Sequence, residues 1–261
     1  MSAEPNISDL KDCSMAPVSR IVNPTPMTVR NGSARIVPRV PPTPAPQIPS
    51  DGLRLYLDAA NPLSYPGTGA TWTDLSPQGK TTTLINSPQF ETANGGEFNF
   101  VSASTKYATV TGTETSSAMT MIAWIRPNGV QQAWAGILYG RDSGSNVNGL
   151  DYRGISGQLT YTWNNLNSSY DFISGLVIPA DQWSMVAVAV QPTQAKLYLG
   201  TAGTLSSSTN AIPHSTATLQ SLDVGRDIGR YFNGRIGVAI VYNRALSDAE
   251  MQQVYTALQA R

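Results

Sequence analysis

The 261-residue sequence predicts an all-β domain, a sandwich of two antiparallel sheets, that follows a proline-rich arm and ends in a short helix. Residues 1–50 hold ten of the 18 prolines and none of the 21 aromatic residues, so they lack the side chains that build a core. Residues 51–261 carry short runs of alternating apolar and polar residues, the pattern of half-buried strands. We therefore predict an extended arm over residues 1–50 and one globular domain over residues 51–261.

The arm is expected to be stiff where proline is most frequent. Six of the twelve residues from Pro38 to Pro49 are proline, which fixes φ repeatedly and favours the polyproline II conformation. The part before this run offers basic side chains and two apolar dipeptides that could add to the sheet edge of another protein. A disordered linker is the alternative. The residues predicted to bind a partner are Arg20, Ile21, Val22, Arg30, Arg35, Ile36, Val37 and Arg39.

Strands are predicted along the domain wherever apolar and polar residues alternate. The runs 119–125 and 183–190 are apolar on both faces, which is typical of central strands covered on both sides. Pro192 follows the second run, where a turn would join it to the next strand as a hairpin. The clearest alternating runs are residues 53–58, 106–110 and 196–199.

The only helix predicted lies at the C-terminus. Ser247 and Glu250 have the spacing of a capping box, in which each side chain accepts a hydrogen bond from a free backbone N–H of the first turn. The apolar residues that follow share one helical face, so the helix should pack against the sandwich. These residues are Met251, Val254, Tyr255 and Leu258.

Composition argues against several classes of protein. The 17 basic and 17 acidic residues give a formal net charge of zero, which does not suit a nucleic-acid binder that works by charge. No stretch approaches about 20 apolar residues, so no membrane span is expected, and the N-terminus lacks the apolar run of a secretory signal peptide. Cys13 is the single cysteine and His214 the single histidine, which argues against a disulfide, a zinc site and a Cys–His nucleophile.

Residues 232–255, FNGRIGVAIVYNRALSDAEMQQVY, closely resemble the closing strand and helix of laminin G-like, concanavalin A-like domains. The resemblance spans about residues 51–258 and implies a two-sheet antiparallel jelly roll. The opening LYLDAANP, with SYPG close behind it, is similar to versions found in bacteriophage structural proteins. Weaker matches in the same order are residues 52–58, 71–76, 120–127 and 182–200.

The resemblance raises an expectation of calcium that this sequence weakens. Many family members carry Asp-Glu after the Gly-x-Ile of the last strand, where this chain has Gly237-Val238, and the usual Asp-rich turn is replaced by residues 100–107. Calcium takes six to eight oxygen ligands, several of them carboxylates. No cofactor is therefore expected, with calcium left open. The remaining weak candidate ligands are Asp58, Asp142, Asp151 and Asp227, although aspartates in loops more often bond their own backbone.

Relatives of this fold include glycoside hydrolases, which generally need two carboxylates about 5–9.5 Å apart. No Glu-x-Asp-x-x-Glu motif occurs here, and Glu250 is committed to the helix cap. We therefore expect no enzymatic activity, unless aspartates distant in the sequence converge. The glutamates of the domain are Glu91, Glu97, Glu114 and Glu250.

Sugar binding is suggested by aromatic residues in or beside loops rich in Asn, Ser and Gly, because aromatic faces stack on sugar rings and loops carry such sites. Packing in the core is the alternative for each of them, and it is favoured for Trp72, Trp124 and Trp183, which lie in core motifs of the family. The candidate glycan-binding residues are Trp134, Tyr161, Trp163 and Tyr170.

Two functions follow as hypotheses. The first is a non-enzymatic bacteriophage virion protein, most simply a capsid decoration or cement protein whose arm anchors the jelly roll on the shell. It would be located in the virion, with the major capsid protein or another virion protein as partner, and would form a homo-oligomer. The alternative is a carbohydrate-binding adhesin module of a tail fibre or spike that recognises a host surface glycan. The two can coexist, because the arm and the loops are separate surfaces.

Overall fold

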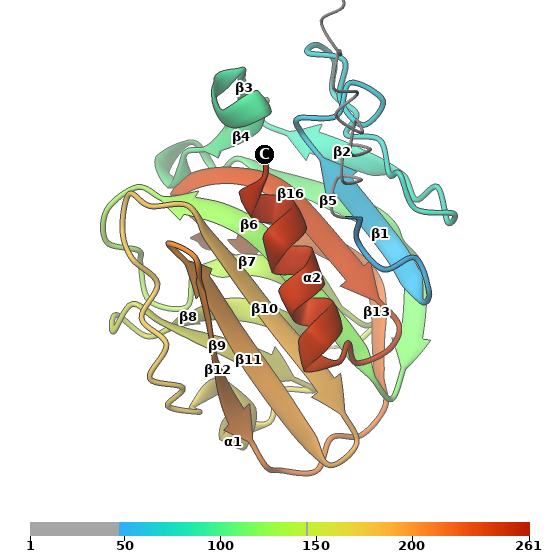
Figure 1. The fold of residues 1–261 in the computed structure, drawn as a ribbon, viewed down its shortest axis with the longest axis vertical. Helices are drawn as coiled ribbons and strands as arrows, with labels where there is room; N and C mark the ends of the chain where they lie inside the picture. The colour runs from blue at the N-terminus through green and yellow to red at the C-terminus, as the bar shows by residue number, and fades with distance from the viewer. Residues whose placement is uncertain (1–46, 145) are drawn as a thin grey trace, which may run out of the picture. The chain divides into compact units, whose positions relative to one another are not determined.

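The structure, a computed structural model, describes residues 47–144 and 146–261. Within these residues two eight-stranded sheets form a sandwich, and helix α2 (Asp248–Gln259) packs against one face of the first of them (Figure 1). The predicted all-β sandwich with a C-terminal helix is therefore confirmed. The residues predicted to bind a partner, between positions 20 and 39, lie outside the described residues.

The first sheet is built around β6 (Met119–Pro127) and β16 (Gly234–Tyr242). Its order is β12-β11-β10-β6-β16-β4-β3, and β1 pairs with β16. Both apolar runs predicted to be central strands are central, since β6 lies between β10 and β16 and β10 lies between β6 and β11. The other strands are β1 (Leu53–Asp58), β3 (Gln89–Glu91), β4 (Glu97–Phe100), β10 (Ser184–Gln191), β11 (Gln194–Thr201) and β12 (Thr204–Asn210).

The second sheet runs β9-β8-β7-β13-β5-β2, and the short hairpin β14–β15 is joined to β7 through β15. Its strands pair antiparallel, apart from the single bridge between β15 and β7. The strands are β2 (Thr82–Ile85), β5 (Tyr107–Ser116), β7 (Gly136–Arg141), β8 (Val147–Arg153), β9 (Gln158–Trp163), β13 (Ala217–Val224), β14 (Arg226–Asp227) and β15 (Arg230–Tyr231).

Two apolar layers hold these parts together. The core between the sheets contains fully buried rings such as Trp72 and Phe98. A second layer lies between α2 and the first sheet, where Ile122, Met185 and Ile240 are clustered with the helix. The helix residues buried in this layer are the predicted ones, Met251, Val254, Tyr255 and Leu258.

Short helical turns occur in segments where we predicted no helix. They are α1 (Asn167–Tyr170) and the 3-10 turns Ala93–Gly95 and Ser102–Ser104. A single turn is too short to produce the 3.6-residue periodicity that reveals a helix in a sequence. The predicted hairpin at Pro192 is confirmed, with Gln191 opposite Gln194.

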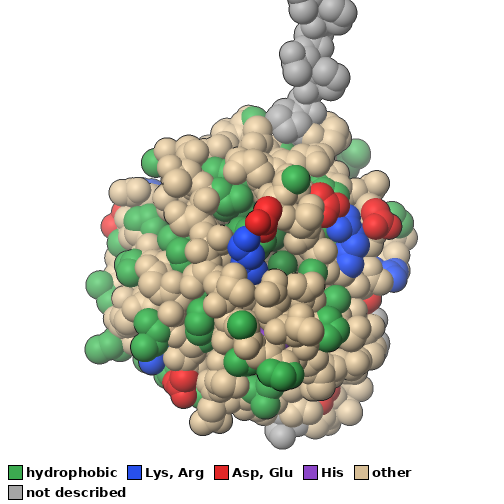
Figure 2. Space-filling view, turned by 60° about the horizontal axis from the view of Figure 1, so that its bottom comes forward, with side chains coloured by type: hydrophobic (Ala, Val, Ile, Leu, Met, Phe, Trp, Pro, Cys, Tyr) green, Lys and Arg blue, Asp and Glu red, His purple; other side chains and the backbone are tan. Residues whose placement is uncertain are grey.

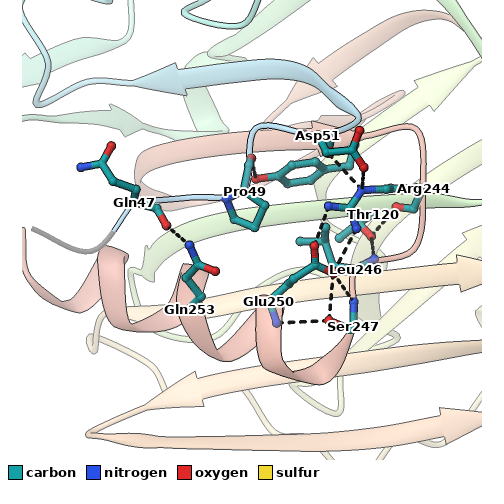
Figure 3. A network of polar contacts seen from close by, with 10 residues as sticks. Gln47, Pro49, Asp51, Thr120, Arg244, Leu246, Ser247, Glu250 and Gln253 are labelled. Carbon is teal, nitrogen blue, oxygen red and sulfur yellow. Dashed lines mark hydrogen bonds and ion pairs between the residues drawn. The ribbon is translucent and has the colours of Figure 1, made fainter.

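The start of α2 is fixed by the predicted capping box. The Ser247 hydroxyl accepts a hydrogen bond from the backbone N–H of Glu250, and the Glu250 carboxylate accepts one from the backbone N–H of Ser247. Arg244 connects this box to the N-terminal side of the domain, because it pairs with both Glu250 (2.6 Å) and Asp51 (3.0 Å) (Figure 3).

Residues 47–50, the last four of the predicted arm, lie along α2 and β16 (Figure 3). The Tyr242 hydroxyl donates to the carbonyl of Pro49 (2.9 Å), and the Gln253 amide donates to the carbonyl of Gln47. Ile48 is partly buried against the apolar layer under α2. The domain therefore holds these four residues through its own C-terminal elements.

Charged side chains are sparse and mostly paired. On the face shown in Figure 2, acidic side chains lie beside basic ones, and Lys196 pairs with Asp248 at 2.7 Å. Within the described part of the chain, no helix is long and apolar enough to cross a membrane.

Candidate functional site

A pocket of about 600 Å³ lies over β7, β8 and β9. Alternate residues of these strands, such as Leu138 and Leu150, point into the core, so the pocket is on the outer face of the second sheet. Its floor is formed by Tyr139, Arg141, Val147, Asp151 and Thr162. Its walls come from α1, from the β14–β15 hairpin and from the segments beside β7 and β9, and contain Trp134, Asn165, Tyr170, Asp227, Ile228 and Arg230.

A chain of hydrogen bonds crosses the floor because residue 149 is glycine. Gly149 lies opposite Tyr139 on one side and Thr162 on the other. A Cβ at this position would lie 2.8 Å from a ring carbon of Tyr139, so glycine lets that ring lie across β8. The Tyr139 hydroxyl donates to Thr162 Oγ1 (2.8 Å), and Thr162 donates to Asp151 Oδ2 (3.2 Å).

Asp151 is the last acceptor in this series of hydrogen bonds, and its carboxyl group is buried. It is 1% exposed, and its Oδ1 has no hydrogen-bond partner within residues 47–144 and 146–261. Burial raises the pKa of Asp151 well above its ordinary value, and the negative charge of Asp227 raises it further, against the hydrogen bond from Thr162. A carboxyl that keeps its proton is able to donate a hydrogen bond.

Asp227 reaches the pocket from the β14–β15 hairpin. Gly136 on β7 permits this approach, because a Cβ there would lie 2.2 Å from the backbone nitrogen of Asp227. The Asp227 carboxylate pairs with Arg141 and, at 3.4 Å, with Arg230. Burial raises the pKa of Asp227, and the two guanidinium groups oppose that effect. The Arg230 side chain is 50% exposed and stands at the rim.

Trp134 and Tyr170 form an aromatic wall. Their rings meet edge to face, with centroids 5.9 Å apart, and both are partly exposed. Trp134 has φ +60°, a left-handed conformation that bulky residues rarely adopt. Tyr170 ends α1, which is held on β9 because the Thr160 hydroxyl donates to the Tyr170 carbonyl (3.2 Å). Ile228, 61% exposed, adds an apolar side chain to the wall.

Two of the predicted glycan-binding residues are not part of this site. Tyr161 and Trp163 are 0% and 1% exposed and pack between the sheets, because they alternate along β9 with outward-facing Thr160 and Thr162. Neither ring offers a face to a ligand, so the structure corrects the prediction for both. Trp134 and Tyr170, the other two, line the pocket.

Of the three tryptophans expected in the core, one is fully buried and two are only partly buried. Trp72 is fully buried. Trp124 and Trp183 belong to the first sheet and the segment beside it, where they stack with centroids 5.9 Å apart and planes at 4°, and both are only partly buried.

The four aspartates predicted as weak calcium ligands occupy different places. Asp58 pairs with Arg261 (2.6 Å), and Asp142 closes a turn by accepting the backbone N–H groups of residues 144 and 146. Asp151 and Asp227 face the same pocket. Among the described residues, no group of three or more His, Cys, Asp or Glu side chains is placed to hold a metal ion.

Tyr139, Arg141 and Thr162 line the pocket but were not predicted from the sequence. Each lies in a strand where nearly every residue is buried, so alternation alone does not show which face a side chain takes. Polar residues at alternate positions of such strands were the available signal. The order β7-β8-β9, which brings them together, comes only from the fold.

Residues 102–252 match the family described as the concanavalin A-like lectin/glucanases superfamily. No curated protein matches the sequence. Among solved structures, domain 4 of a GH43 extracellular arabinanase from Geobacillus stearothermophilus, in complex with arabinotriose, is similar with a TM-score of 0.60 and 17% identity. That similarity covers 80% of this chain and 100% of the arabinanase domain.

Two further solved structures share the fold. Trypanosoma rangeli sialidase, in complex with 2,3-difluorosialic acid, has a TM-score of 0.57 and 16% identity over 85% of this chain and 36% of the sialidase. The binding domain of botulinum neurotoxin DC, in complex with SialylT, has a TM-score of 0.59 and 15% identity over 80% of this chain and 51% of that domain. This chain therefore spans about a third of the sialidase and half of the neurotoxin domain.

Proposed function

Because this chain belongs to the concanavalin A-like lectin/glucanases superfamily, we propose that it binds carbohydrate in the pocket over β7, β8 and β9, and that it binds without cleaving. Carbohydrate binding is the second of the two functions predicted from the sequence. Two of the structural neighbours, the arabinanase domain and the neurotoxin binding domain, were solved with arabinotriose and SialylT.

The observation that carries the proposal is an aromatic wall facing buried polar groups in one pocket. Trp134 and Tyr170 offer apolar surface to the carbon face of a sugar ring. Asp151, Asp227 and Arg230 offer donors and acceptors to its hydroxyls. The pocket volume of about 600 Å³ is within the range of small-molecule sites.

Binding without hydrolysis is supported by the positions of the glutamates. None of the four lines the pocket, and each is paired with arginine elsewhere. Glu91 and Glu97 pair with Arg235, and Glu114 pairs with Arg54. Glu250 pairs with Arg244 and caps α2.

One observation favours glycoside hydrolysis as a second candidate. Asp151 and Asp227, 76 positions apart in the sequence, face one pocket, and burial raises the pKa of Asp151 in particular. A protonated and an ionised carboxyl are the pair that such hydrolysis requires. Release of reducing ends from a bound oligosaccharide, lost in Asp227→Asn, would establish this activity in place of simple binding.

A glycan array followed by calorimetry tests the proposed binding. Trp134→Ala should weaken binding of the best array ligand at least about tenfold, because it removes the stacking surface. Trp183→Ala is the matched control: it also removes a partly buried tryptophan, but one that does not line the pocket. Equal losses in both variants, or no ligand on a broad array, would refute the proposal.

The virion role predicted for residues 1–50 is a separate proposal. Its arm residues lie outside the described part of the chain. What supports it is the proline-rich, aromatic-free composition of the arm and the resemblance of the segment 55–67 to bacteriophage structural proteins. A carbohydrate-binding pocket on the domain is compatible with this role.

A further inference from the structure

Building on the proposed function, we infer that the pocket selects acidic sugars, whose carboxylate binds the Arg230 guanidinium at the rim while the rest of the ring packs against Trp134 and Tyr170. The ligand class is therefore a glycan with a terminal carboxylate, such as a sialic acid or a uronic acid. Neutral sugars lack the group that this rim binds.

The balance of charge in the pocket is the first support. Its lining contains two guanidinium groups, Arg141 and Arg230, and two carboxyl groups, Asp151 and Asp227. Asp227 pairs with both arginines. Asp151 contacts neither arginine by hydrogen bond or ion pair within the described residues, and its Oδ2 accepts from Thr162 instead. The pocket therefore contains two guanidinium groups that share a single carboxylate, and Asp151 lies outside those ion pairs.

The exposure of Arg230 is the second support. Arg141 is largely enclosed beside Asp227, whereas half of the Arg230 side chain is exposed and its contact with Asp227 is long, at 3.4 Å. A guanidinium has five N–H donors in a planar fork that matches a carboxylate. One long contact leaves donors for a second carboxylate, so the geometry suits a bidentate ion pair with a ligand.

Asp151 supplies the third support. Its Oδ1 lacks a partner among the described residues, although the side chain is 1% exposed and lines the pocket. A neutral carboxyl here donates a hydrogen bond to a sugar oxygen or to the ligand carboxylate, whereas an ionised one repels an acidic ligand. The inference therefore includes a pH dependence in which acidic sugars are released as Asp151 ionises.

The groups around Asp151 that bear on this dependence come from each neighbouring element. Tyr139 and Arg141 belong to β7 and Thr162 belongs to β9. Asp227 and Arg230 belong to the β14–β15 hairpin. Asp223, which lies opposite Tyr139, is neutralised by Arg226 at 2.9 Å.

The test compares four probes by calorimetry: 3′-sialyllactose, its methyl ester, a galacturonate trimer and lactose. Wild-type protein should bind at least one acidic probe about tenfold or more tightly than lactose, and the ester should lose most of that gain. The sialyl and galacturonate arms separate the two sources of carboxylate. Arg230→Gln should remove the preference, and Arg230→Lys should restore part of it.

Measuring ligand affinity as a function of pH adds a second test, because a residue with only a structural role would not change the pH profile. Affinity for the acidic probe should fall as pH rises in the wild type, and Asp151→Asn should flatten this profile. The inference is overturned if lactose binds as tightly as the acidic probes, or if Arg230→Gln keeps the preference with an unchanged melting temperature. If lactose binds as tightly as the acidic probes but Trp134→Ala weakens that binding, the proposed carbohydrate binding still stands. If no probe and no array sugar binds, both proposals are refuted.

Discussion

At the scale of single residues, the pocket contains features that stability alone does not favour. Trp134 has a left-handed backbone and a partly exposed ring, and Asp151 buries a carboxyl with an unpartnered oxygen among the described residues. Each is expected to cost free energy of folding, on the order of 1–3 kcal/mol. Such costs are concentrated at functional sites, which is consistent with the proposed binding role.

Trp134 provides the first prediction. Both Trp134→Gly and Trp134→Ala should lose sugar binding, but the glycine variant should be more stable than the alanine variant by about 1 kcal/mol, because glycine adopts φ +60° without steric cost. Urea denaturation measures the difference. If alanine is as stable as glycine here, the left-handed backbone stores no strain.

Asp151 provides the second prediction, on stability against pH. The pKa of Asp151 is raised in the folded protein by burial, so its contribution to stability is present below the unfolded pKa and is lost as pH rises toward the folded value. Wild-type stability should fall by up to about 1.4 kcal/mol per pH unit across this window relative to Asp151→Asn. The two proteins should be equally stable near pH 3. A constant difference at every pH would contradict the raised pKa.

At the scale of elements, the prediction from sequence succeeds where a local pattern determines the structure. The capping box at Ser247 and the apolar runs at 119–125 and 183–190 depend on neighbours in the chain or on burial of both faces, and all three form as expected. The single turn α1 is too short to show helical periodicity in the sequence. Neither the turn nor the place of Tyr170 in the pocket wall could therefore be predicted.

Helix α2 gives the third prediction. The hydrogen bond from Arg244 lowers the pKa of Glu250 to about 2, so the carboxylate stabilises the fold above its ordinary pKa of 4.5 and loses that effect as pH falls toward 2. Glu250→Gln should cost about 1 kcal/mol at pH 7 and little near pH 2. Thermal denaturation at both values measures this. The exposed control Gln252→Ala should change stability by less than about 0.5 kcal/mol at either pH.

At the scale of the whole domain, the site could not be predicted because it is assembled by strand order. The fold class follows from alternation and from the motif at residues 232–255. The pocket instead depends on two close approaches, of the Tyr139 ring to Gly149 and of Asp227 to Gly136, that join distant segments. For the same reason Tyr161 and Trp163, which we predicted to bind glycan from positions in or beside loops, lie in β9 with their rings in the core.

The arm gives the fourth prediction. Deletion of residues 1–46 keeps Ile48 and Pro49, which contact the domain, and should leave the melting temperature and sugar affinity unchanged. If the arm anchors the domain on a capsid, this deletion should abolish incorporation into particles. Undiminished incorporation would refute the anchoring role while leaving the carbohydrate site intact.

A crystal structure of the domain with its best glycan ligand tests the central claim most directly. We predict that the sugar ring lies against Trp134 and Tyr170 and that its polar groups reach Arg230 and Asp151. A glycan bound elsewhere, for example on the stacked pair Trp124 and Trp183, with the β7–β9 pocket filled only by solvent, would contradict the account.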